Sequence, residues 1–370
     1  MVAPGASDRP VPTGAGDDPD PPLPGLDRAA VAAWMDDHVG GLVGPVAFTL
    51  VGGGHSNLTY AARDRRGRGW VVRRPPLSGA AGKAHDMGRE YRVLTALAPT
   101  VVPVPDPVAL CEDARVNGCP FYVMELVEGH VVDNPAAAER ALPTTALRRR
   151  ASDQLVDVLA DLHRVDIDAV GLGDSARRDD FLDRQLHRLR QVWEQTKTRE
   201  LPAVERLHAR LVQRAPAQRH TGIVHSDYRF GNVIVDDAGD LRAVLDWELW
   251  TLGDVLADVG FLLNNWYEPG EDTPLVWMEV PPTVAGGFAT RAQVAARYAE
   301  RTGFDLADLS YYRAFQYWKV AVIAEGVKRR YEARSMANAD VDFAHLDRRV
   351  IDLLGLAEHH LAEPPGAGTG

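Results

Sequence analysis

The chain has 370 residues, of which 45% are hydrophobic and 25% are charged, and its formal net charge is -11. A chain of this length can bury two hydrophobic cores, which excludes a small binding module. The acidic balance argues against broad binding of nucleic acid, because proteins that read a polyanion usually carry a basic face.

Both ends of the chain have the composition of unstructured segments. Residues 1–25 are rich in Pro, Gly and Asp and lack the charged start and apolar core of a signal peptide, so we expect a disordered arm. Residues 359–370 are expected to form a flexible tail. The longest uncharged stretch, residues 40–62, is interrupted by glycines and Pro45, which favours strands and a loop over a membrane span. We therefore expect a cytoplasmic protein without a membrane partner, and the sequence leaves its oligomeric state open.

A glycine-rich loop between two predicted strands is the first candidate binding element. Residues 46–51 and 58–62 have strand-like composition, and G-G-G-H-S-N lies between them at residues 52–57. Glycines let backbone N–H groups approach a polyphosphate closely, and Ser56 and Asn57 can add side-chain donors. Because the loop is not a regular G-x-G-x-x-G, the alternative is that its glycines serve only the geometry of the turn.

The next predicted strand, residues 70–74, ends in two arginines. Side chains two apart in a strand share a face, so if Val71 lines a nucleotide pocket, Arg73 points toward the phosphates and Arg74 points away. We therefore choose Arg73 as the phosphate-binding cation. The alternative is that both arginines are solvated residues of an edge strand.

A helix is predicted over residues 85–97, where Met87, Tyr91 and Leu94 recur at helical spacing and form the expected buried face. Glu90 adjoins that stripe. An ion pair from Glu90 would orient Arg73, although a Glu at such a boundary is more often a surface residue.

Residues 121–124 predict a further strand, followed by a connection, E-L-V-E-G, at residues 125–129. Cys111 and Cys119 have no CxxC spacing and no neighbouring His, so neither zinc nor a redox pair is indicated, and a disulfide between them stays open.

Beyond this connection the pattern becomes helical. One apolar stripe consists of Leu147, Ala151, Leu155, Leu159 and Leu162. A further helix fits residues 179–195, where basic and acidic side chains are nearly balanced.

The most informative stretch is H-S-D-Y-R-F-G-N at residues 225–232. Runs of β-forming residues flank it, and D-A-G-D at residues 237–240 predicts a turn into a return strand at residues 241–245. Such a hairpin would bring Asn232 and Asp246 to one edge, where both side-chain oxygens could reach a single hard cation.

These residue types are the ones that phosphoryl transfer needs. One carboxylate takes the proton of the acceptor hydroxyl, and a separate Asn and Asp hold the Mg²⁺ that neutralises the transferring phosphate. Asp227, Asn232 and Asp246 stand in that order. H-x-D-x-x-x-x-N on its own would also arise by chance, but further carboxylates follow in G-D-V-L-A-D. We expect Asp254 to cap a helix at its N-terminus, whereas Asp258 either orients the loop or is a solvated helix residue.

Two later helices are predicted at residues 291–302 and 306–331. The second ends in a basic cluster, which favours an anionic acceptor, although it is equally well explained as a solvated helix end: Lys328, Arg329, Arg330 and Arg334. The aromatic residues of this region could line a pocket, but such residues more often belong to a core: Trp266, Trp277, Tyr311, Tyr312, Tyr317 and Trp318.

Residues 225–232 and V-L-D-W-E at residues 244–248 resemble the two diagnostic segments of the aminoglycoside phosphotransferase (APH) family. G-G-H-S-N-L-T-Y at residues 53–60, V-R-R-P-P at 72–76 and R-E-Y-R-V-L at 89–94 are similar to the kinase-like domains associated with certain acyl-CoA dehydrogenases. The resemblance extends over roughly residues 26–358.

The resemblance implies that Asp227 is the catalytic base, that Asn232 and Asp246 are the Mg²⁺ ligands, and that His225, Arg229 and Asp258 are supporting residues. Ser226 stands where the family more often has Gly. The nucleotide-binding residues implied are Gly53, Gly54, Ser56, Asn57, Arg73 and Glu90, with backbone groups of Glu125 and Val127 contacting adenine.

The expected fold is α+β and protein-kinase-like, with a small β-rich N-lobe at residues 26–127 that binds nucleotide and a larger, mainly helical C-lobe at residues 128–358 that carries the catalytic loop and the acceptor site. The expected function is ATP- and Mg²⁺-dependent transfer of the γ-phosphate to a hydroxyl of a small molecule, with a hydroxyacyl-CoA as first acceptor and GTP as an alternative donor. Two other functions stay open: a nucleotide-binding pseudokinase module, suggested by Arg73 where kinases usually have Lys, and an aminoglycoside-type antibiotic kinase.

Overall fold

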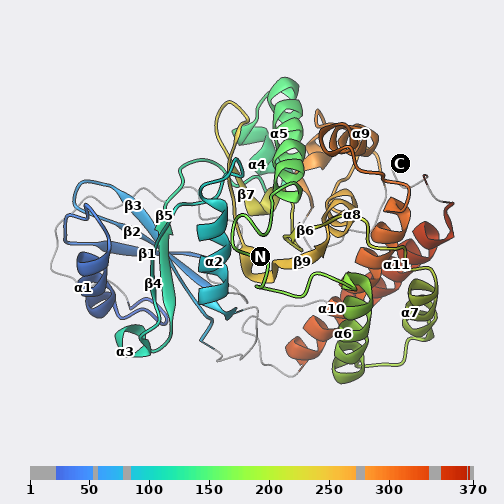
Figure 1. Cartoon of the computed structure of the whole chain (residues 1–370), viewed down its shortest axis with the longest axis horizontal. Helices are drawn as coiled ribbons and strands as arrows, with labels where there is room; N and C mark the ends of the chain where they lie inside the picture. Colours follow the sequence, from blue (N-terminus) through green and yellow to red (C-terminus); the bar gives the residue numbers. More distant parts are fainter. Residues whose placement is uncertain are drawn as a thin grey trace. The chain divides into compact units, whose positions relative to one another are not determined.

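The computed structural model describes residues 22–52, 57–77, 85–271, 280–332, 343–364 and 366. The chain divides into two compact units (Figure 1). Unit 1 comprises Met1–Pro99 and Val104–Val127, and unit 2 comprises Thr100–Pro103 and Glu128–Gly370.

Unit 1 is built on one antiparallel sheet with the strand order β1-β2-β3-β5-β4. The strands are β1 (Ala47–Gly52), β2 (Leu58–Arg63), β3 (Gly69–Arg74), β4 (Pro107–Cys111) and β5 (Phe121–Glu125), and the helices are α1 (Arg28–His38), α2 (Met87–Leu97) and α3 (Ala114–Asn117). Because β3 lies between β2 and β5, the edge-strand alternative for its arginines is wrong.

The two faces of this sheet have different partners, as the alternation of side chains in a strand requires. One face packs with α1 into a hydrophobic core that includes Tyr60, Trp70 and Val123. The register pairs Arg73 with Tyr122 on the opposite face, where the side chains meet residues of α2. Figure 1 shows α1 and α2 on the two sides of the strands.

Unit 2 is mainly helical. Its helices are α4 (Pro135–Ala141), α5 (Thr145–His163), α6 (Phe181–Thr196), α7 (Pro202–Gln213), α8 (Leu256–Asn264), α9 (Arg291–Thr302), α10 (Leu309–Glu332) and α11 (Phe343–Ala362). Two short antiparallel pairs join β6 (Thr221–Val224) to β9 (Thr251–Asp254) and β7 (Val233–Val235) to β8 (Leu241–Val244). Helix α10 is buried on almost every side, among α6, α7, α8 and α11, which makes it the central helix of the unit.

Several details differ from the sequence predictions. Val93 rather than Tyr91 completes the buried face of α2. Asp254 is not the N-cap of the following helix, because α8 begins at Leu256 with Val255 in the capping position. Asp254 is the last residue of β9, and its buried carboxylate accepts hydrogen bonds from the Leu256 N–H (3.1 Å) and the Tyr312 hydroxyl (2.7 Å). Cys111 and Cys119 are free, so they form no disulfide.

The aromatic residues that the structure describes in this region are buried in unit 2, as the core alternative predicts, and Trp266 also lines a hollow: Trp266, Tyr311, Tyr312, Tyr317 and Trp318. Trp277 and Arg334 lie outside the described residues. Among the described helices, none combines the length and the apolar character that crossing a bilayer would require.

The packing of α8 on α10 requires a glycine at residue 260. A Cβ there would lie 2.9 Å from the Tyr312 carbonyl carbon and 3.0 Å from the Arg313 nitrogen, both backbone atoms. Gly260→Ala should therefore destabilise the protein by about 1–3 kcal/mol through overpacking. Gly355 on α11 has nothing within 4 Å of the same position. Gly355→Ala is the matched control and should stabilise by up to about 1 kcal/mol. Urea unfolding midpoints measure both, and equal midpoints for the two variants would contradict this account of the packing.

Candidate functional site

The loop between β6 and β7 brings Asp227 and Asn232 into direct contact. The side-chain nitrogen of Asn232 donates to the backbone oxygen of Asp227 and to its carboxylate Oδ2, each at 2.8 Å. Both bonds use the amide nitrogen of Asn232, which leaves its carbonyl oxygen as a hard donor for a cation. A short 3₁₀ turn, Phe230–Asn232, sets the residue in this position.

The hairpin of β7 and β8 fixes the other candidate metal ligand beside Asn232. Val233 pairs with Val244, and the Leu245 N–H donates to the Asn232 backbone oxygen at 2.8 Å. Asp246, the next residue, therefore lies at the same edge of the hairpin. Its backbone is left-handed, with φ 64°, a conformation that costs free energy for a residue with a Cβ and is concentrated at functional sites.

His225 ties the start of the loop to the end of this hairpin. Its Nε2 lies 2.8 Å from the Leu245 carbonyl oxygen, and its Nδ1 accepts a hydrogen bond from the Asp227 N–H at 3.2 Å. These two contacts assign the proton of the neutral ring to Nε2. The side chain is fully buried, so its observed contacts are structural.

Asp258 on α8 holds the backbone at the start of the loop. Its carboxylate accepts the N–H of His225 at 2.6 Å and the N–H of Ser226 at 2.8 Å, and the residue is 0% exposed. The solvated-helix alternative for Asp258 is therefore wrong. Ser226 has φ 74°, the left-handed region that a glycine adopts without strain, so here the tertiary contacts must hold a serine in it.

His163 and Tyr298, which the sequence analysis did not single out, complete this arrangement. His163 at the end of α5 lies 3.4 Å from Asp258 Oδ2 through Nε2 and 2.7 Å from the Tyr298 hydroxyl through Nδ1. Burial raises the pKa of the Asp258 carboxyl, but the hydrogen bonds from the His163 ring and the His225 backbone N–H, together with the electrostatic effect of these residues, outweigh it, so the pKa is lowered overall. A polar residue on the apolar stripe of α5 was the available signal for His163.

Asp227 keeps one carboxylate oxygen for another partner. Its Oδ2 is held by Asn232, whereas Oδ1 is buried and accepts no hydrogen bond from the residues that the structure describes. Arg229 Nε lies 3.5 Å from this oxygen and forms an ion pair with it. A buried oxygen without a hydrogen bond is costly in a fold unless it has a role with a ligand or a proton.

The described residues contain no cluster of three or more His, Cys, Asp or Glu side chains that could hold a metal ion. Asn232 and Asp246 supply one amide and one carboxylate. That set suits Mg²⁺, which commonly takes few protein ligands and completes its octahedron with waters and substrate phosphates.

A hollow lies next to the catalytic loop within unit 2. Its walls are mainly apolar, from Phe230, Leu262, Trp266, Tyr267 and Pro282, with Arg229, Asp133 and Asn265 as polar members. Phe230 and Trp266 have ring centroids 5.5 Å apart.

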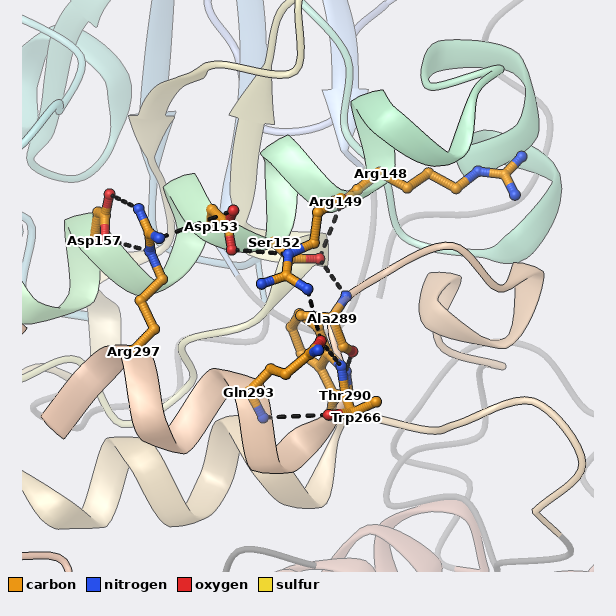
Figure 2. Close-up of polar contacts among 10 residues, drawn as sticks. All are labelled: Arg148, Arg149, Ser152, Asp153, Asp157, Trp266, Ala289, Thr290, Gln293 and Arg297. Atoms are coloured by element: carbon orange, nitrogen blue, oxygen red, sulfur yellow. Dashed lines mark hydrogen bonds and ion pairs between the residues drawn. The ribbon is translucent and has the colours of Figure 1, made fainter. Parts of the chain in front are cut away.

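A chain of hydrogen bonds fixes the indole of Trp266 in this wall (Figure 2). Its nitrogen donates to the Ala289 carbonyl at 2.8 Å, and the Ala289 N–H donates to the Ser152 hydroxyl on α5 at 3.1 Å. Ser152 in turn donates to the Arg148 carbonyl at 2.9 Å. Arg297 of α9 binds both carboxylate oxygens of Asp157 on α5, each at 2.7 Å, and so holds the two helices together.

In unit 1, Glu90 is the centre of a buried polar network. It is 1% exposed and forms an ion pair with Arg73, with Nε and Oε2 2.9 Å apart. The Tyr122 hydroxyl donates to Oε2 at 3.0 Å and the Asn57 side-chain nitrogen donates to Oε1 at 2.6 Å. Asn57 Oδ1 also lies 2.9 Å from His85 Nδ1. The predicted pairing of Arg73 with Glu90 is present, and the surface alternative for Glu90 is wrong.

The sequence predicts that Arg74 points away from the phosphates, and Arg74 is buried on the face of the sheet opposite to Arg73, where it donates to the Gly25 and Pro75 carbonyl oxygens. The Glu125 N–H already donates to the Asp106 carbonyl at 2.8 Å. Val127 is the last residue of unit 1. Gly53, Gly54 and Ser56 lie outside the described residues.

The basic cluster at the end of α10 is not a uniform cationic surface. Lys328 is 6% exposed and forms an ion pair with Asp347 on α11 at 2.7 Å. Arg329 donates to the Gln195 backbone oxygen. Lys328 and Arg329 are thus engaged by other groups of unit 2. Their contacts weaken the argument that this cluster binds an anionic acceptor.

The sheet of unit 1 and the helical unit 2 with its H-S-D-Y-R-F-G-N loop define the protein-kinase-like class of phosphotransferase folds. The chain belongs to the phosphotransferase enzyme family APH, whose model matches residues 47–315.

Comparison with individual proteins agrees with this family. The chain is 33% identical over 293 residues to acyl-CoA dehydrogenase family member 10 of Mus musculus, which covers 78% of this chain and 27% of that protein. A match to acyl-CoA dehydrogenase family member 11 of Rattus norvegicus, 28% identical, covers 83% of this chain and 40% of that protein. The chain therefore spans well under half of the length of these curated relatives.

Among solved structures, a putative aminoglycoside phosphotransferase from Ralstonia eutropha JMP134 matches with a TM-score of 0.74 and 31% identity, covering 90% of this chain and 98% of that chain. The amicoumacin kinase hAmiN, solved in complex with AMP-PNP, Ca²⁺ and Ami, matches with a TM-score of 0.57 and 15% identity over 89% of this chain and 94% of that chain. At that identity the second likeness concerns the fold alone.

Asp258→Asn should lower the free energy of unfolding by about 2–3 kcal/mol at pH 7, because the buried backbone N–H groups lose a charged acceptor. The folded pKa of Asp258 lies below its ordinary value of 3.8. Asp258 therefore stabilises the fold above that pH, and its contribution is lost as the pH falls through the lower folded pKa.

The difference from the parent protein should accordingly shrink below about pH 4, as measured by urea unfolding across pH. Asp305→Asn removes an exposed carboxylate that pairs with Arg219. This control should change stability by less than about 1 kcal/mol. Equal losses in the two variants would contradict the role given to Asp258.

Proposed function

We propose that this chain is an ATP- and Mg²⁺-dependent phosphotransferase that acts on a hydroxyl of a small molecule, with Asp227 as its catalytic base. The observation that carries the proposal is the contact of Asn232 with Asp227 beside the hairpin that brings in Asp246. The amide of Asn232 thereby orients the base and remains able to ligate a cation. Phosphoryl transfer needs both a positioned base and a bound metal ion.

In the proposed reaction the acceptor hydroxyl binds next to Asp227 Oδ1. This oxygen takes the hydroxyl proton as the acceptor oxygen forms its bond to the γ-phosphorus of ATP, while the bond from that phosphorus to the β,γ-bridging oxygen breaks and ADP leaves. Asn232 keeps Oδ2 engaged and so directs Oδ1 to the acceptor. Arg229 Nε lies 3.5 Å from Oδ1 and forms an ion pair with the carboxylate.

Asn232 through Oδ1 and Asp246 through its carboxylate are the proposed protein ligands of Mg²⁺. When bound, the ion would neutralise charge on the phosphates of the nucleotide. His225 supports this set indirectly, because its contact with the Leu245 carbonyl fixes the residue before Asp246.

For the nucleotide we propose unit 1, with Arg73 as the cation for the phosphates. Glu90 forms an ion pair with Nε of Arg73, and the guanidinium that it orients is the proposed phosphate donor. The side chain of Asn57 is engaged with Glu90 and His85, so its proposed role narrows to its backbone and to holding the end of the glycine loop. Gly53, Gly54, Ser56, Glu125 and Val127 keep the backbone or hydroxyl roles that the family resemblance implies.

The hollow beside the loop is small, about 20 Å³, but the apolar character of its lining favours an acceptor with an apolar portion. A polycationic aminoglycoside calls for a pocket rich in carboxylates, whereas Asp133 is the acidic side chain among the lining residues and Arg229 opposes it. We therefore propose a hydroxyacyl-CoA as the first acceptor to test. The similarity to acyl-CoA dehydrogenase family members supports the same choice.

Asp227→Asn should lower turnover by roughly 10² to 10⁴, because the amide cannot accept the acceptor proton, while nucleotide binding is retained. The measurement is mass spectrometry of reactions with ATP, Mg²⁺ and a panel of hydroxylated acceptors that includes hydroxyacyl-CoA thioesters and an aminoglycoside. Asp237→Asn, in an exposed turn where the side chain is 95% exposed, is the matched control and should retain parent turnover. Near-normal turnover of Asp227→Asn would rule out the assigned base.

The same assay separates the alternatives. A pseudokinase module would be thermally stabilised by ATP and would yield no phosphorylated product with any acceptor. An antibiotic kinase would modify the aminoglycoside in preference to the acyl-CoA thioesters.

Arg73 and Arg74 form a matched pair for testing the nucleotide role of unit 1. Arg73→Met should weaken binding of MgATP roughly 10- to 100-fold, because charge-assisted hydrogen bonds to phosphate are lost. Arg74→Met removes bonds to the Gly25 and Pro75 carbonyl oxygens and should lower stability while changing MgATP affinity less than about threefold. Isothermal titration calorimetry measures the affinities, and a larger loss in Arg74→Met would reverse the assignment.

A further inference from the structure

A buried lysine on the central helix lies against the catalytic loop. Lys319 of α10 is 9% exposed, and its ammonium donates to the Ser226 backbone oxygen at 3.3 Å. The same ammonium lies 5.5 Å from the centroid of the Phe261 ring on α8. Burial of a lysine is costly unless its charge is compensated, so the position calls for an explanation.

The lysine completes a clamp on a strained residue. The Ser226 N–H donates to Asp258 on α8 at 2.8 Å, and its carbonyl accepts from Lys319 on α10. Its φ of 74° lies in the left-handed region. Both backbone polar groups of Ser226 are therefore held from separate helices, immediately before Asp227 in the chain.

The charges around the ammonium explain how it remains in the core. Burial lowers the pKa of Lys319, the carboxylates of Asp227 and Asp258 raise it, and Arg188 on α6 lowers it, with a net pKa of about 8. The charged form thus predominates at neutral pH and places a positive charge near two carboxylates, that of Asp227 in the loop and that of Asp258 on α8.

We propose that Lys319 is a positioning residue for phosphoryl transfer, which holds the Ser226 peptide in its left-handed conformation and thereby aims Asp227 at the acceptor. This inference rests on the proposed function for its catalytic consequence. A purely structural lysine would instead contribute to stability without affecting the loop or the chemical step.

The matched control is Lys328, a second buried lysine on the same helix. Its ammonium contacts Asp347 on α11 at 2.7 Å and the Thr198 hydroxyl at 3.2 Å, away from the catalytic loop. Lys319→Met and Lys328→Met each remove one buried ammonium from α10, and they differ in whether the lost contact is to Ser226.

Hydrogen exchange by mass spectrometry tests the clamp without requiring turnover. In the full chain, Lys319→Met should speed amide exchange in peptides that cover residues 225–232 by roughly tenfold, because Ser226 loses one of the two contacts that hold its backbone. Lys328→Met should leave exchange in these peptides at the parent rate. Equal exchange in the two variants would overturn the clamp.

Steady-state kinetics with MgATP and the acceptor identified from the panel test the catalytic consequence. Lys319→Met should lower kcat roughly 10- to 100-fold with KM for MgATP changed less than about threefold, because the base is misaimed while the nucleotide still binds. The parent kcat should fall as the pH rises through about 8, where Lys319 loses its proton. Lys319→Met should lack this basic limb, and Lys328→Met should retain it.

Replacing Ser226 shows whether Lys319 acts through that residue. Glycine adopts positive φ without strain, so the clamp matters less in a Ser226→Gly background. The fall in kcat caused by Lys319→Met should therefore be smaller there than in the parent. An equal fall in both backgrounds would overturn action through Ser226. Absence of product from the parent protein would instead overturn the proposed function, and hydrogen exchange would still decide the clamp.

Discussion

The carboxylate of Asp258 is the interaction on which the catalytic loop depends. It lies in the core on α8, fully buried, and accepts two consecutive backbone N–H groups of the loop from His225 and Ser226. A charged acceptor in a dry environment binds N–H groups more strongly than a neutral one. The loop geometry is thus set by a helix that follows it in the chain, and His163 from α5 orients the carboxylate in turn.

Unit 1 also contains a buried carboxylate that holds several segments of the chain together. Glu90 is a buried carboxylate that collects donors from β3, β5 and the residue before β2, namely Arg73, Tyr122 and Asn57. In each unit the desolvation of one carboxylate is offset by donors from segments distant in sequence. Such networks specify one arrangement of these segments, because a partly satisfied network would leave a buried charge unpaired.

The sequence predicted those parts of the structure that have local signals. Strand alternation separated Arg73 from Arg74, and turn residues predicted the hairpin that brings Asp246 beside Asn232. The sequence left Asp258 ambiguous. It predicted the helix that contains Lys319 but missed the role of this residue, because α10 is buried on almost every side and has no polar face from which a buried lysine could be distinguished. Whether a charged residue in such a helix faces solvent or a catalytic loop depends on tertiary packing, which no local pattern encodes.

The left-handed conformation of Ser226 makes the loop depend on tertiary packing. A glycine, which the family more often has at this position, adopts the left-handed conformation without strain. With a serine, the strain must be offset by contacts from α8 and α10, through Asp258 and Lys319. The orientation of Asp227 then becomes a property of the packed core of unit 2 rather than of the loop alone. Changes in the packing of α8 on α10 will consequently reach the base, because both anchors of the residue before it stand on those two helices.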